Sequence, residues 1–138
     1  MAERPIETDV YRRLCRARDY IDHCFDHPLN LDLISRRACF SRYHFLRLFR
    51  QTFQKTPHQY LIERRIEKAK ELLNADDLRV TDVCFEVGFQ SLGSFSTLFH
   101  RYVGHAPATY RERSRQRRAA CRRVPGCFIF MYKLDAAS

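Results

Sequence analysis

The sequence predicts an all-α protein, because its apolar residues recur at helical spacing and glycine is rare. Glycine occupies only 4 of the 138 positions, and apolar residues return every three or four positions along most of the chain. A chain of this length with 45% hydrophobic residues can bury an ordinary core. We therefore expect about seven helices, followed by a short apolar C-terminal tail.

The first half of the chain predicts three helices and then a long one. An apolar stripe from Val10 to Phe25 ends before His27-Pro28, where the proline disfavours further helix. Asn30 is suited to cap a short helix over residues 31–38, and Ser41 is suited to cap the next. Thr56-Pro57 is typical of a cap followed by a first-turn proline, and its helix is expected to end near residue 74.

The second half of the chain repeats the first. The repeat predicts a short helix over residues 80–87, a turn over residues 88–90 and a further helix capped by Ser91. Upstream of Ser91 the offset becomes 49, so the second turn is expected to be one residue longer. Each unit has the layout of a helix-turn-helix. At an offset of 50 the identical pairs are Ser41/Ser91, Phe45/Phe95, Leu48/Leu98, Phe49/Phe99, Pro57/Pro107 and Tyr60/Tyr110.

The repeat also suggests how the chain is divided. We expect a first helix-turn-helix subdomain over residues 8–55 and a linker helix over residues 56–75. A second subdomain is expected over residues 76–117, and a basic and apolar tail over residues 118–138.

The net charge of +9 is concentrated in two arginine clusters. Residues 36–50 carry five arginines and no acidic residue, and residues 111–123 carry seven arginines and Glu112. Residues 81–110, which span most of the second unit, are slightly acidic. Clustered positive charge of this kind indicates a polyanionic partner.

Two segments carry a resemblance to a known family, FSRYHFLRLFRQTFQKTPHQYL at 40–61 and GFQSLGSFSTLFHRYVGHAPATYR at 88–111. Over residues 8–116 the chain resembles the DNA-binding domain of AraC/XylS-type bacterial transcription regulators. The resemblance implies a sequence-specific regulator of transcription that inserts two recognition helices into successive major grooves of double-stranded DNA. We expect it to bind as a monomer, with RNA polymerase as a further partner. Larger members carry an added sensing domain, so we expect either a stand-alone regulator or a fragment of a larger one. If it stands alone, we expect no small-molecule effector.

The resemblance assigns the base-facing positions of both recognition helices. Arg47 is the strongest candidate, because arginine can contact guanine O6 and N7 together. Thr97 stands where an arginine is frequent in the family, so we expect discrimination to come mostly from the first unit and from DNA shape. The base-contact candidates are Tyr43, Leu46, Arg47, Gly93, Ser96 and Thr97. The DNA-backbone candidates are Arg36, Arg37, Ser41, Arg42, Arg50, Ser91, Ser94, His100, Arg101, Arg111 and Arg113.

Other classes of protein find little support. The histidines are scattered, and no G-x-S-x-G, H-E-x-x-H or phosphate-loop pattern occurs, so we expect no enzyme, cofactor or metal. The six cysteines are expected to be free thiols that mostly fill the core, with Cys121 and Cys127 as the one pair for a redox or metal test. The longest apolar run, residues 127–132, is far shorter than the roughly 20 residues of a membrane span. No secretory signal is recognisable, and a cytoplasmic location is expected.

Two questions stay open at this stage. A non-specific architectural DNA-binding protein and a protein-interaction adaptor are the alternatives to a sequence-specific regulator. The apolar segment after residue 123 is expected either to pack on the helices or to serve in dimerisation or partner docking.

Overall fold

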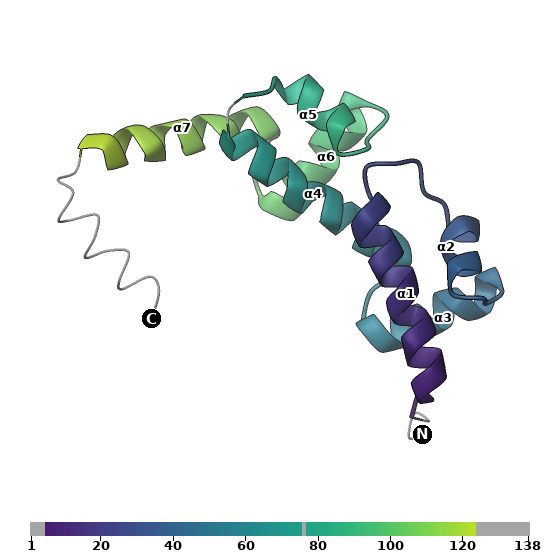
Figure 1. The fold of residues 1–138 in the computed structure, drawn as a ribbon. Coiled ribbons are helices and arrows are strands. Elements are labelled where there is room, and N and C mark those ends of the chain that lie inside the picture. Colours follow the sequence, from purple (N-terminus) through teal and green to yellow (C-terminus); the bar gives the residue numbers. More distant parts are fainter. Residues whose placement is uncertain (1–4, 76, 124–138) are drawn as a thin grey trace.

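The computed structural model describes residues 5–75 and 77–123, over which the chain forms seven helices and no strand (Figure 1). The prediction of an all-α fold is confirmed. The apolar tail after residue 123 and Cys127 lie outside the described residues. The helices are α1 (Thr8–Cys24), α2 (Leu31–Arg37), α3 (Arg42–Phe53), α4 (Pro57–Ala75), α5 (Val80–Glu86), α6 (Leu92–Val103) and α7 (Pro107–Arg123).

The predicted capping residues lie directly before the helices that they were expected to cap. The side chains of Asn30, Ser41 and Ser91 each accept a hydrogen bond from a backbone N–H in the first turn of α2, α3 and α6. Before α4, Thr56 and Gln59 each accept a bond from the backbone N–H of the other, at 3.1 and 2.9 Å. This reciprocal capping fixes where the long helix begins.

The fold contains two separate hydrophobic cores with α4 between them. α1 and α3 pack on the first part of α4 and α2 packs on α1 and α3, while α5 and α6 pack on the later part of α4 (Figure 1). Phe45 and Phe49 are fully buried in the first core with ring centroids 5.5 Å apart. Phe95 and Phe99 repeat this arrangement in the second core at 5.6 Å. The repeat predicted from the sequence is thus a repeat of packing.

The backbone repeats as well, at its positions of positive φ. The turn between the two helices of each unit contains Cys39 (φ 57°) in the first and Gly88 (φ 100°) in the second, 49 residues later. The residue that ends the second helix of each unit is Gln54 (φ 62°) or Gly104 (φ 91°), 50 residues apart. Residues 38–41 connect α2 to α3 and residues 87–91 connect α5 to α6, so the second turn is one residue longer, as predicted.

The last helix packs on the end of the linker helix. Ser114 of α7 is buried and donates a hydrogen bond to Asn74 Oδ1 of α4 at 2.7 Å. The Asn74 amide in turn donates to the hydroxyl of Tyr110 at 3.2 Å. Beyond this contact α7 extends away from both cores and continues past residue 117, where the second subdomain was expected to end (Figure 1).

The prediction that the cysteines mostly fill the core is wrong. Of the cysteines in the described part of the chain, only Cys84 is fully buried, and Cys15 and Cys24 are partly buried. Cys39 and Cys121 are exposed. Cys39 lies in a tight turn with positive φ, which directs its side chain outward although apolar residues flank it.

Candidate nucleic-acid interface

The second helix of the first unit presents a row of side chains to solvent. Its opposite face is held in the core by Phe45 and Phe49, so Tyr43, Leu46 and Arg47 point outward. Tyr43 is 80% exposed, Leu46 is 36% exposed, and Arg47 is exposed. These predicted base-contact residues of α3 line one shallow hollow together with Arg50.

Arg47 has one weak contact within the described residues. Its guanidinium lies 3.4 Å from His44 Nδ1, and no ion pair involves it within the described residues. By contrast, Arg42 lies 3.8 Å from the carboxylate of Asp32, and Arg37 lies over the ring of Tyr20. Arg47 can therefore turn to a ligand without giving up a strong internal contact.

The corresponding surface of α6 is made of short side chains. Gly93 and Thr97 are exposed and Ser96 is partly buried. A Cβ placed on Gly93 would meet nothing within 4 Å, so the helix surface there is open. Ser94 is exposed in the first turn of α6, where free backbone N–H groups favour an anion. The short side chains of α6 suit close approach to a phosphate backbone better than direct contact with base edges, which requires longer side chains.

The predicted backbone-contact residues fall on several elements. Arg111 differs from the others, since its side chain is partly buried. Arg113 lies 3.2 Å from His105 Nε2, and Arg42 is the one paired with Asp32. The exposed members are Arg36, Arg37, Ser41, Arg42, Arg50, Ser91, Ser94, His100, Arg101 and Arg113.

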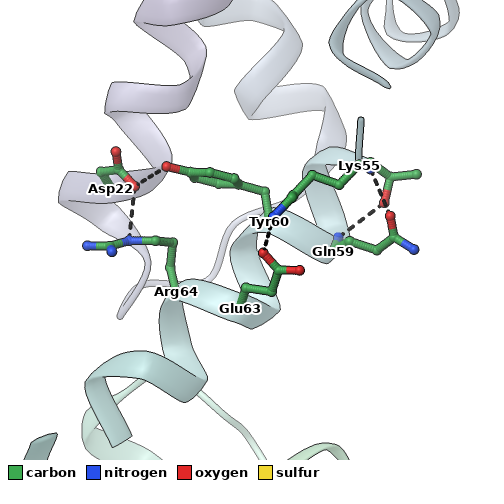
Figure 2. A network of polar contacts seen from close by, with 7 residues as sticks. Asp22, Lys55, Gln59, Tyr60, Glu63 and Arg64 are labelled. Carbon is green, nitrogen blue, oxygen red and sulfur yellow. Dashed lines mark hydrogen bonds and ion pairs between the residues drawn. The ribbon is translucent and has the colours of Figure 1, made fainter. Parts of the chain in front are cut away.

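A polar network that sequence reasoning missed attaches the first unit to the linker helix (Figure 2). The Tyr60 hydroxyl of α4 donates to Asp22 of α1 at 2.7 Å, and Arg64 Nε lies 3.0 Å from the same carboxylate. One turn away, Lys55 donates to Glu63 at 2.5 Å. Burial, followed by the hydrogen bond to Asp22 and its negative charge, raises the pKa of Tyr60 to about 12. The repetition of Tyr60 as Tyr110 in the sequence marked this position as important, but its partner Asp22 lies in a distant part of the sequence.

Two further classes of site were sought in the described ranges 5–75 and 77–123. No group of three or more His, Cys, Asp or Glu side chains there could hold a metal ion. No helix among those described is long and apolar enough to cross a membrane.

The geometry defines a double helix-turn-helix protein, with two outward-facing second helices joined by one long helix. Residues 34–113 match a family model described as a helix-turn-helix domain. The chain belongs to the AraC-type family of helix-turn-helix DNA-binding transcription regulators.

Named relatives agree with this family in sequence and in fold. The regulatory protein SoxS of Salmonella typhimurium is 30% identical over 95 residues, which cover 69% of this chain and 89% of SoxS. The DNA-binding domain of AdpA, solved in complex with a target DNA, superposes with a TM-score of 0.70 at 29% identity, over 82% of this chain and 98% of that domain. The C-terminal domain of AraT, a response regulator from Geobacillus stearothermophilus, gives a TM-score of 0.68 at 28% identity, over 79% and 88% of the two chains.

Proposed function

We propose that this regulator binds double-stranded DNA sequence-specifically, with α3 and α6 in successive major grooves. The observation that carries the proposal is the repeated geometry of these two helices. Each is fixed by a buried phenylalanine pair on one face and presents its other face to solvent. The similarity to the AdpA domain, whose structure includes a target DNA, supports the same mode of binding here.

The two helices contribute unequally to this proposed recognition. On α3, Arg47 contacts a guanine edge, while Tyr43 and Leu46 pack against bases or the sugar-phosphate chain. On α6, Gly93 lets the helix approach closely, and Ser96 and Thr97 offer only short hydroxyls. Discrimination between sequences therefore comes mostly from α3, and α6 sets position and responds to DNA shape.

The proposed mode of binding also sets the expected partners. One chain carries both recognition helices, so a monomer suffices to occupy the site. RNA polymerase is the proposed second partner, since a regulator bound beside a promoter can contact it directly. Control by the abundance of the protein, without a small effector, predicts that added metabolites leave the DNA affinity unchanged.

A competition titration tests the proposal against its alternatives. A fluorescent duplex taken from a random-library selection is bound by the protein and then challenged with excess random DNA at several salt concentrations. A specific regulator keeps the complex, and about six phosphate contacts give a slope of log K against log salt near −5. Steep salt dependence without discrimination would instead establish an architectural binder, and the absence of DNA binding would favour an adaptor.

A further inference from the structure

A buried arginine of the linker helix lies where the two helix-turn-helix units meet. Arg65 is only 9% exposed, and its Nε donates to the Phe25 carbonyl at 2.6 Å. A second guanidinium nitrogen donates to the His27 carbonyl at 3.0 Å, so the side chain holds the loop that follows α1. The same guanidinium lies 5.7 Å from the ring centre of Phe89, in the turn between α5 and α6. Arg65 thus contacts both units at once.

The turn of the second unit touches the loop of the first directly, at Gly88. A Cβ on Gly88 would lie 2.8 Å from the Phe25 carbonyl oxygen and 3.1 Å from the backbone carbonyl carbon of Asp26. It would also lie 3.1 Å from Arg65 Nε. The first two neighbours are backbone atoms, which cannot swing aside as the end of a flexible side chain does. Only glycine fits this contact without separating the two units.

The turn itself disfavours a side chain at Gly88, because L residues rarely adopt a φ of 100°, and the contact with the first unit is a second reason for glycine. The equivalent residue of the first unit is Cys39, which carries an exposed side chain at φ 57°. Gly104 has a φ of 91°, close to the 100° of Gly88, yet a Cβ there would meet nothing within 4 Å. Of the two glycines with positive φ in the described part of the chain, only Gly88 closely approaches the other unit.

The buried positive charge of Arg65 is compensated by groups within the junction. Burial lowers the pKa of Arg65, and the negative charge of Asp26 counteracts that effect. The two carbonyl oxygens accept hydrogen bonds from the guanidinium and so compensate for its lost hydration. A neutral side chain of similar length would fill the space but would release the loop that Arg65 holds.

We propose that Arg65 and Gly88 are positioning residues that fix the second helix-turn-helix unit against the first and thereby set the spacing of α3 and α6. Their importance for DNA rests on the proposed two-groove binding. The two cores share no buried residue, so apart from this junction the units are connected mainly through α4. Successive major grooves on one face of DNA recur about every 34 Å, so a reorientation of one unit carries its recognition helix out of register.

The first test needs no DNA. Residual dipolar couplings are measured on the whole ¹⁵N-labelled chain for the wild type, Gly88→Ala, Arg65→Met and the control Gly104→Ala. Wild type and Gly104→Ala are expected to fit one alignment tensor across α1–α3 and α5–α6, whereas Gly88→Ala and Arg65→Met require two. A single tensor in both junction variants would overturn the proposal. If Gly88→Ala does not fold, Arg65→Met decides the question.

The second test uses duplexes in which the two selected half-sites are moved apart or together by one or two base pairs. The wild type and Gly104→Ala are expected to prefer one spacing, and the ratio of best to shifted affinity should fall towards one in the junction variants. An unchanged ratio with a uniform loss of affinity would refute a positioning role. If the wild type itself ignores spacing while the dipolar couplings behave as expected, two-groove binding fails and the junction in the free protein stands.

Discussion

Replacing Arg47 by alanine separates base reading from general attraction to DNA. The side chain is exposed, and its contact within the described chain is the 3.4 Å approach to His44. Phe45 and Phe49 keep α3 in place after the change, and alanine favours a helix. The free energy of unfolding should therefore shift by no more than about 0.5 kcal/mol, so any larger effect on binding belongs to the DNA contact.

The expected size of that effect follows from the geometry of the contact. A bidentate arginine–guanine pair discriminates against the wrong base by about 1–3 kcal/mol, which is about 5-fold to 150-fold in affinity. The loss should appear on the selected duplex and be small on random DNA. In a panel of duplexes with single base-pair changes, the variant should have lost its preference at one base pair and kept the others.

The assay is a fluorescence-anisotropy competition with the selected duplex, the single-change panel and random duplex. Arg50→Ala is the matched control, because Arg50 is exposed on the same helix and is assigned to the phosphate backbone. That control should weaken binding similarly on all duplexes and reduce the salt slope by about 0.9. An equal loss on selected and random DNA for Arg47→Ala would show that Arg47 contacts only phosphate, and the assignment would be wrong.

Three further predictions concern the scaffold. Folding raises the pKa of Tyr60 from 10.0 to about 12, so the folded state favours the protonated phenol. The protonated Tyr60 therefore contributes fully to the free energy of unfolding below about pH 10, and this contribution is lost as the pH rises towards 12. Urea unfolding of the wild type should show this loss relative to Tyr60→Phe, and identical pH profiles would contradict it. Phe95→Ala should lower the free energy of unfolding by about 3–5 kcal/mol, because Phe95 is buried in the second core. Hydrogen exchange should then accelerate in α5 and α6 but not in α1–α3, and equal acceleration in both halves would disprove separate cores. Asn30→Ala removes the cap of α2 and should lower stability by about 1 kcal/mol with DNA specificity intact, and a changed base preference would show that the cap influences α3.

Much of the fold was predictable because its determinants are local. Asn30, Ser41 and Ser91 accept bonds from residues three positions ahead, so sequence alone indicates where the helices begin. The periodic phenylalanines identify which faces of α3 and α6 are buried, and the other faces follow by exclusion. For the same reason the exposure of Tyr43 and Arg47 could be anticipated before the structure was known.

The remaining features depend on partners that are remote in the chain. An arginine such as Arg65 is usually expected to be exposed to solvent, so the sequence does not indicate that it is buried. Only the fold brings it to carbonyl groups about 40 residues away. Tyr60 and Asp22 are equally distant, and no spacing rule connects them. Cys39 was misjudged because its position in a turn, not its hydrophobic neighbours, decides where its side chain points. Sequence periodicity reports which face of a helix is buried but not which element covers it.

Selection of bound duplexes from a random DNA library is the most direct test of asymmetric recognition by α3 and α6. We predict two enriched half-sites whose centres lie about one helical turn apart, with strong base preferences under α3, including a guanine lost in Arg47→Ala, and weak preferences under α6. A single half-site, or equally strong preferences at both, would contradict the unequal roles assigned to the two helices. No enrichment over the starting library would contradict sequence-specific binding altogether.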